Sequence, residues 1–110
     1  MNQQRESIGV HLRITCAPLE AERLLSALQD LQRLSRAEPG NRMFDILQRC
    51  EDAGGFLVLE EFESEAALAA HRASNHFRHF KEATASLRLT IERYAPVTTR
   101  HVLEMEVMLD

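Results

Sequence analysis

The chain has 110 residues, with 13 Lys and Arg against 17 Asp and Glu and a formal net charge of −4. This length predicts one domain, residues 1–110, with a modest core of its own. The basic residues are scattered, whereas nucleic acid and anionic membrane surfaces are bound by clustered cations, so we expect neither partner. No apolar run approaches the roughly 20 residues that span a bilayer, and the polar first residues do not resemble a signal peptide. We therefore expect a cytoplasmic protein.

The first half of the chain alternates between strand and helix patterns. Residues 1–6 are polar, and we expect them to be disordered. Apolar and polar residues alternate over 7–16, which predicts a half-buried strand. Leucines recur every three or four residues over 18–36, which predicts an amphipathic helix that begins at a proline. The turn at 38–41 ends this helix, because its Pro-Gly-Asn sequence favours a chain reversal and permits positive φ.

The second half begins with a predicted hairpin. Residues 42–50 and 56–62 read as two antiparallel strands, and we expect Gly54 and Gly55 between them to supply unusual backbone angles. Ser64 then precedes a short helix over 66–71 and suits its N-cap.

Helical spacing resumes after Ser74 or Asn75, either of which suits a second N-cap, and predicts helix to at least Leu89. Residues 88–94 also alternate, so they fit either helix or strand. A last strand is predicted within 98–109.

The resulting order is β-α-β-β-α-β, an α+β fold of the ferredoxin-like, split βαβ type. Helices would cover one face of the sheet, yet residues 56–62 are apolar on both faces: Phe56, Val58 and Phe62 point one way, Leu57 and Leu59 the other. An open apolar face needs a partner. We therefore expect a homodimer with stacked sheets, with the strand within 98–109 exchanged between subunits.

Three histidines lie close together in the second half of the chain, but their spacing predicts no metal site. His71, His76 and His79 are five and three residues apart, and neither His76 nor His79 has an acidic residue at the i+4 position. Cys16 and Cys50 fit no metal spacing either, and both are expected as thiols. The sequence also lacks a Gly-rich phosphate loop and a nucleophile elbow.

His71 and Glu60 are the candidate catalytic pair. His71 ends the short helix, where it either caps the helix dipole or serves as a proton carrier in an apolar pocket. Glu60 and Glu61 are adjacent in a strand, so one of them faces a covered side. That carboxylate is either half of a structural ion pair, with Arg13 or Arg42, or a base with a raised pKa.

Five further residues are candidates for substrate contacts. Asn41 follows the first turn, where it is a turn residue or a site residue. Phe44, Phe77 and Phe80 are core residues or the walls of an apolar cavity. His76 shares the helix with Phe77 and is either a surface histidine or a contact to substrate.

Several segments together resemble the antibiotic biosynthesis monooxygenase superfamily. They are Glu-Pro-Gly-Asn at 38–41, Met-Phe-Asp-Ile-Leu-Gln at 43–48, Leu-Glu-Glu-Phe at 59–62, Ala-His at 70–71 and Asn-His-Phe at 75–77. The chain is most similar to the small quinol-monooxygenase and autoinducer-degrading branch, over roughly residues 8–94. The resemblance implies a dimeric α+β barrel with a pocket between sheet and helices.

The resemblance also implies a reaction without cofactor or metal: oxidation by O₂ of a small quinol-like or phenolic aromatic, which supplies the electrons itself. It points to His71 as general base or orienting donor. The chain has no tryptophan, and Lys81 lies near the place of an iron-binding histidine in haem-degrading relatives, which argues against haem degradation. The alternatives are an isomerase or degradative enzyme that acts without O₂ on a small signalling or sugar-derived metabolite, and a dimeric ligand-binding module without catalysis.

Overall fold

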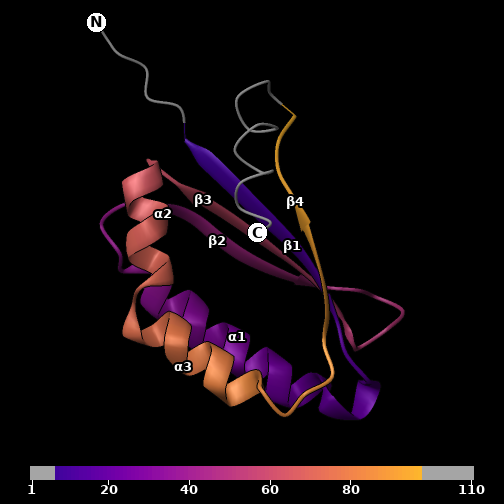
Figure 1. The fold of residues 1–110 in the computed structure, drawn as a ribbon. Coiled ribbons are helices and arrows are strands. Elements are labelled where there is room, and N and C mark those ends of the chain that lie inside the picture. Colours follow the sequence, from indigo (N-terminus) through magenta and orange to yellow (C-terminus); the bar gives the residue numbers. More distant parts are fainter. Residues whose placement is uncertain (1–6, 98–110) are drawn as a thin grey trace, which may run out of the picture.

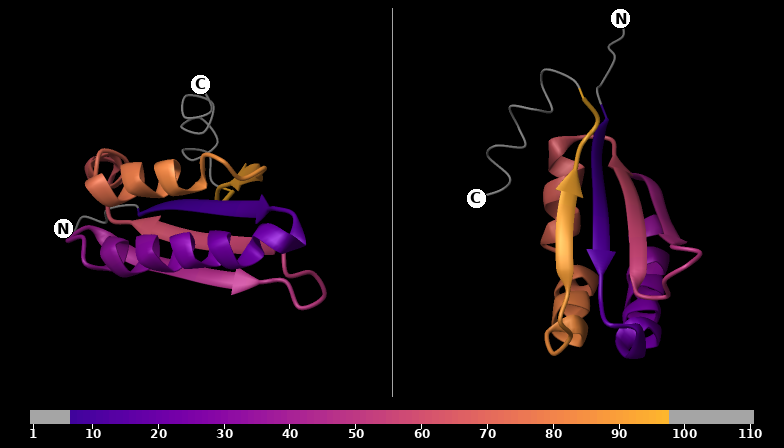
Figure 2. Two further views of the ribbon diagram at one scale, coloured as in Figure 1. Left: turned by 90° about the horizontal axis from the view of Figure 1, so that it is seen from below. Right: turned by 90° about the vertical axis from the view of Figure 1, so that its right-hand side faces the viewer.

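The computed structural model describes residues 7–97 as a four-stranded sheet with helices on one face (Figures 1 and 2). The strands are β1 (Ile8–Thr15), β2 (Asn41–Gln48), β3 (Gly55–Phe62) and β4 (Thr90–Tyr94), and the helices are the 3-10 turn η1 (Pro18–Glu20), α1 (Ala21–Arg36), α2 (Glu65–Arg72) and α3 (Asn75–Thr84). The predicted disordered residues 1–6 and the predicted strand within 98–109 lie outside the described residues.

The sheet is antiparallel with the strand order β2-β3-β1-β4, so the predicted ferredoxin-like arrangement is confirmed. Alternate residues of β1 and β3 face the helices, and the leucines of α1 that recur every three or four residues pack on them. The fully buried centre of this core contains Ile14, Leu24, Leu28, Phe44, Phe56 and Val58. Burial of these apolar side chains is the main source of the fold's stability.

The last helix is shorter than predicted, and its end determines the fourth strand. Helix α3 stops at Thr84, not at Leu89. Leu87 keeps the helical spacing, but it reaches the core from a turn in which its N–H donates to the Thr84 carbonyl at 3.0 Å. The chain then runs along β1, so the ambiguous residues 90–94 form a strand. Periodicity alone could not separate these outcomes, because both bury leucine side chains.

The turn glycines are needed for space and not for unusual dihedrals. Contrary to prediction, Gly40, Gly54 and Gly55 all lack positive φ. A Cβ at Gly54 would lie 2.1 Å from the carbonyl oxygen of Cys16, and a Cβ at Gly40 would lie 2.4 Å from the Cβ of Ala67. Glycine therefore lets the hairpin and the turn before β2 approach their neighbours closely.

The face of the sheet away from the helices carries apolar side chains, as predicted. Leu57 faces away from the core with 41% of its surface exposed, and its partner in β2, Leu47, is 46% exposed. Tyr94 on the edge strand is 49% exposed. Within residues 7–97, no helix has the length and apolar character needed to cross a bilayer.

Candidate functional site

Four polar side chains from four parts of the chain meet where the helical layer joins the sheet. Glu38 lies in the turn between α1 and β2, Glu60 is on β3, His71 is in the last turn of α2, and His76 is in the first turn of α3. We call these four residues the acid–base array.

Two serine caps place its histidines. Ser64 accepts from the Ala67 N–H at 3.1 Å and starts α2, as predicted. Ser74 accepts from the Phe77 N–H at 3.2 Å and starts α3, and its hydroxyl also donates to the His71 carbonyl at 2.6 Å. The end of α2 is thereby tied to the start of α3.

Glu38 bridges the two histidines. Its Oε2 lies 2.9 Å from His71 Nδ1 and 2.5 Å from His76 Nε2. A carboxylate only accepts hydrogen bonds, so both ring nitrogens donate to it. The other carboxylate oxygen, Oε1, is buried and has no partner among the described residues. Hydrogen bonds to an ionised acceptor are the stronger kind, so this bridge holds both imidazoles in place.

Glu60 is the most perturbed group in the array. It is 5% exposed, it shares the core face of β3 with Val58 and Phe62, and burial raises its pKa from 4.5 to about 8. Arg72 opposes this rise, whereas Glu38 adds to it. The carboxyl group is therefore mainly protonated at neutral pH, although it lies in the interior of the protein.

Among the described residues, Glu60 forms an ion pair with neither expected arginine, Arg13 or Arg42. Arg13 projects from the other face of the sheet and pairs with Glu92 at 3.6 Å. The side chain that pairs with Glu60 is His71, whose Nε2 is 3.7 Å from Glu60 Oε1. Because the Nδ1–H of His71 points to Glu38, the lone pair of a neutral His71 lies on Nε2 and faces the protonated Glu60.

His71 is enclosed by aromatic rings. Its ring centroid lies 4.9 Å from that of Phe62, 5.2 Å from that of Phe77 and 6.2 Å from that of Phe44. The residue is 2% exposed, and burial lowers its pKa more than the bond to Glu38 raises it. At neutral pH, His71 is therefore a neutral imidazole that donates to Glu38, and only large movements would let a ligand touch it.

Three members of the array are of residue types that bind metal ions. Glu38, His71 and His76 offer one ligand atom each, all within 4.8 Å of one another. Zinc bonds of about 2.0–2.2 Å would set tetrahedral ligand atoms roughly 3.3–3.5 Å apart. The carboxylate oxygen is closer than this to both nitrogens. The three side chains thus form a hydrogen-bonded cluster as they stand and would have to separate to hold a divalent ion.

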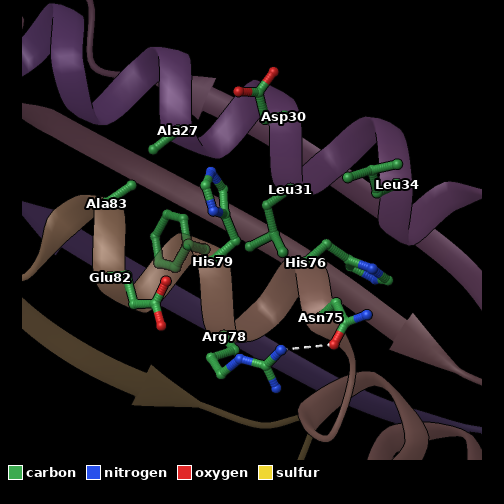
Figure 3. A pocket seen from close by; sticks show the side chains of 11 residues that line it. Ala27, Asp30, Leu31, Leu34, Asn75, His76, Arg78, His79, Glu82 and Ala83 are labelled. Carbon is green, nitrogen blue, oxygen red and sulfur yellow. Dashed lines mark hydrogen bonds between the residues drawn. The ribbon is translucent and has the colours of Figure 1, made fainter.

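A groove of about 510 Å³ lies beside the array, between α1 and α3 (Figure 3). Leu31, Leu34 and Phe80 supply its apolar walls. Figure 3 shows the ring of His79 standing between the two helices, while His76 lies at the end of the groove nearest Leu34. His76 is therefore the residue that the groove and the array share.

The structure gathers only some of the predicted site residues. His71, Glu60, His76, Phe44 and Phe77 lie in or against the array. Phe80 lines the groove instead. Asn41 starts β2, and its side-chain amide donates to the Met43 carbonyl at 3.3 Å, which is the local bonding of a turn residue.

Glu38 was not predicted as a site residue. The sequence places it in a turn and in a segment shared with the family, and its separation from His71 by 33 residues leaves no local pattern that marks a site residue. The neighbouring Ser35, fully buried on α1 with its hydroxyl 3.5 Å from His71 Nδ1, was missed for the same reason. The one sequence feature that points to Glu38 is an acidic residue in a predicted turn next to a buried strand.

Residues 7–83 match the sequence profile of the family described as antibiotic biosynthesis monooxygenase. The chain belongs to this family. It is 36% identical over 67 residues to a Bacillus subtilis protein named "Putative monooxygenase YcnE", an alignment that covers 61% of this chain and 70% of that protein.

Solved structures of relatives share the fold. A protein from Bacteroides thetaiotaomicron, titled as a putative antibiotic biosynthesis monooxygenase, is 25% identical with a TM-score of 0.79 over 86% of this chain and 90% of that one. A Pseudomonas aeruginosa protein is 27% identical with a TM-score of 0.73 over 87% of this chain and all of that one. A Nitrosomonas europaea structure with the same family title is 22% identical with a TM-score of 0.74, which supports the fold alone.

Proposed function

We propose that this protein is a cofactor-independent monooxygenase that oxidises a small quinol-like or phenolic aromatic with O₂. The acid–base array is the observation that carries the proposal. It runs from a buried, protonated carboxyl group at Glu60, through His71 and Glu38, to a partly exposed imidazole at His76. Membership of a family described as monooxygenases supports the same reaction class.

In this reaction the protein needs only to bind the substrate and to transfer protons, because the substrate itself supplies the electrons. A base takes a hydroxyl proton, and the phenolate then gives its electrons to O₂. A new C–O bond forms and the O–O bond breaks, with one oxygen kept in the product and the other leaving as water. Starting from a hydroquinone, the ring loses four electrons and two hydrogens, which balances the reduction of one O₂. A neutral acid such as Glu60 suits the return of a proton when water is formed.

Within the array we propose different roles for the two predicted catalytic residues. His71 is the orienting donor, because its Nδ1–H holds Glu38 in place and its ring is enclosed by phenylalanines. Glu60 is its partner on the other ring nitrogen and the store of a proton. These roles require the apolar shell, since exclusion of water keeps the Glu60 carboxyl neutral.

We also propose that the protein is a homodimer built through the open face of the sheet. That face presents Leu47 and Leu57 from adjacent strands, with Tyr94 on the edge strand. His11, on the same face, has a buried Nδ1 with no partner among the described residues. A second sheet packed on this face would remove the apolar side chains from water.

Oxygen uptake with a panel of hydroquinones tests the reaction. The purified protein, treated with a chelator, is expected to consume one O₂ per quinol above the rate of a heat-inactivated sample. His71→Ala should lose most of this rate, whereas His11→Ala, on the opposite face of the sheet, should keep it. Absence of uptake across the panel, or full activity in a folded His71→Ala, would remove the proposal.

The isomerase alternative uses the same array. A protonated carboxyl group and an imidazole within 3.7 Å of each other are also what a proton-transfer isomerase needs. Turnover of a candidate metabolite at equal rates under argon and under air would favour this alternative. An oxygenase stops under argon.

A further inference from the structure

His76 is the member of the array that lines the groove, although the Glu38 side chain is nearly as exposed. His71 and Glu60 are 2% and 5% exposed, and rings cover His71. The side chain of His76 is 18% exposed and forms one end of the groove between α1 and α3 (Figure 3). A ligand that occupies this groove can therefore contact the array at His76 while the core stays closed.

The hydrogen bonds leave His76 ready to accept a proton. Its Nε2 donates to Glu38, and this is the only hydrogen bond of the His76 side chain among residues 7–97. A neutral imidazole that carries its proton on Nε2 has a free lone pair on Nδ1. When Nδ1 takes up a proton, the ionised Glu38 stabilises the imidazolium, as the carboxylate of a catalytic triad does for its histidine. Glu38 is thus placed as a positioning residue for His76.

The walls of the groove suit a neutral aromatic ring with one acidic hydroxyl. Its volume of about 510 Å³ is within the usual range for small-molecule sites. Leu31 and Phe80 offer apolar contact. The groove carries two carboxylates, Asp30 and Glu82, against the one guanidinium of Arg78, and this charge balance disfavours a multiply charged anion. A phenol satisfies both conditions, because it is uncharged until its hydroxyl reaches the base.

The geometry points to the groove between α1 and α3 as the site of the phenolic substrate, with His76 as its catalytic base and Glu38 as the positioning residue. The inference rests on the proposed function for the chemical class of the ligand. In the step concerned, the O–H bond of the phenol breaks, the proton goes to His76 Nδ1, and the electron pair stays on the phenolate oxygen. No redox change occurs in this step.

Binding of 4-nitrophenol tests the site without turnover, because this probe absorbs visible light only as its phenolate. At a pH where the free probe is mainly neutral, the wild-type protein is expected to bind it saturably and to raise its visible absorbance. His76→Gln should abolish the rise in absorbance and weaken binding about tenfold, equivalent to ~1.4 kcal/mol. Glu38→Gln should still bind the probe but ionise a smaller fraction of it, which a purely structural role would not produce.

A second pair of variants tests the place of binding. Ala83 lines the groove from the exposed side of α3, so Ala83→Trp should fill the groove and weaken binding at least about tenfold, ~1.4 kcal/mol, without disturbing the core. Ala69→Trp places the same side chain on exposed α2, outside the groove, and should bind like the wild type, as should His11→Gln.

Each contrary result has a separate meaning. No saturable binding, unchanged binding in Ala83→Trp, or unchanged ionisation in His76→Gln would overturn the inference. If the probe binds as expected but no quinol consumes O₂, the site stands and the monooxygenase proposal falls. If quinols are oxidised with the same KM in Ala83→Trp, the reaction stands and the groove is not its site.

Discussion

Replacing Glu60 with glutamine should remove a pH dependence of stability that the wild-type protein shows between pH 6.5 and about 8. Burial raises the pKa of Glu60 from 4.5 to about 8, so across this range the folded protein holds a proton that the unfolded chain has lost. The free energy of unfolding therefore falls by about 1.4 kcal/mol for each pH unit above 4.5, until the folded carboxyl group ionises.

His71 acts in the opposite direction, but at lower pH. Burial lowers its pKa from 6.5, so its contribution to stability rises with pH and levels off above 6.5, as the unfolded chain loses its proton. Between pH 6.5 and about 8, the raised pKa of Glu60 has the larger effect. The wild-type protein is expected to lose about 1 kcal/mol of unfolding free energy across this range, because the folded carboxyl group is half ionised near pH 8 and the His71 contribution still rises slightly above pH 6.5.

Urea denaturation at pH 6.5 and pH 8.0, at one fixed protein concentration, measures this change. Glu60→Gln, in which an amide replaces the neutral acid, should show no loss of stability from pH 6.5 to pH 8.0. Glu61→Gln is the matched control: its side chain is on the other face of the same strand, bonded to Ser7, and the decrease should persist. A wild-type protein as stable at pH 8.0 as at pH 6.5 would refute the argument that Glu60 is protonated in the fold.

Three further changes test the fold and the assembly. Leu57→Glu puts a charge on the open sheet face and should convert the proposed dimer to monomer in sedimentation velocity; a wild-type monomer at micromolar concentration contradicts the proposed dimer. Ser74→Ala removes the N-cap of α3 and should cost about 1 kcal/mol in urea denaturation, so an unchanged midpoint would contradict its role. Gly54→Ala forces a Cβ onto the Cys16 carbonyl and should lower the melting temperature more than Gly55→Ala; equal effects would contradict the close approach.

Local patterns predicted most of the fold, because the elements bury one face each. The alternation in β1 and β3 and the leucine spacing in α1 follow directly from burial on the helical side of the sheet. The end of α3 could not be predicted in the same way. Leu87 fits a helix by spacing, yet the pairing of β4 with β1, which is a contact distant in sequence, decides the path of the chain.

Local patterns also predicted part of the site, namely Glu60 and His71, but they could not predict Glu38. Glu60 stood out as a charge within an apolar strand, and His71 stood out beside aromatic residues. The link between them and the surface is Glu38, whose role depends on two hydrogen bonds across 33 and 38 residues of sequence. No periodicity marks such a residue. The fold is needed to bring the turn after α1 next to α2 and α3.

The destination of labelled oxygen tests the central claim most directly. Chelator-treated protein is given ¹⁸O₂ and the hydroquinone with the fastest uptake, and the product is analysed by mass spectrometry after a short reaction. One labelled oxygen atom is expected in the product and the other in water, and the label in the product should be lost in His76→Gln. A product without label, or formation of the same product under argon, would contradict the central claim.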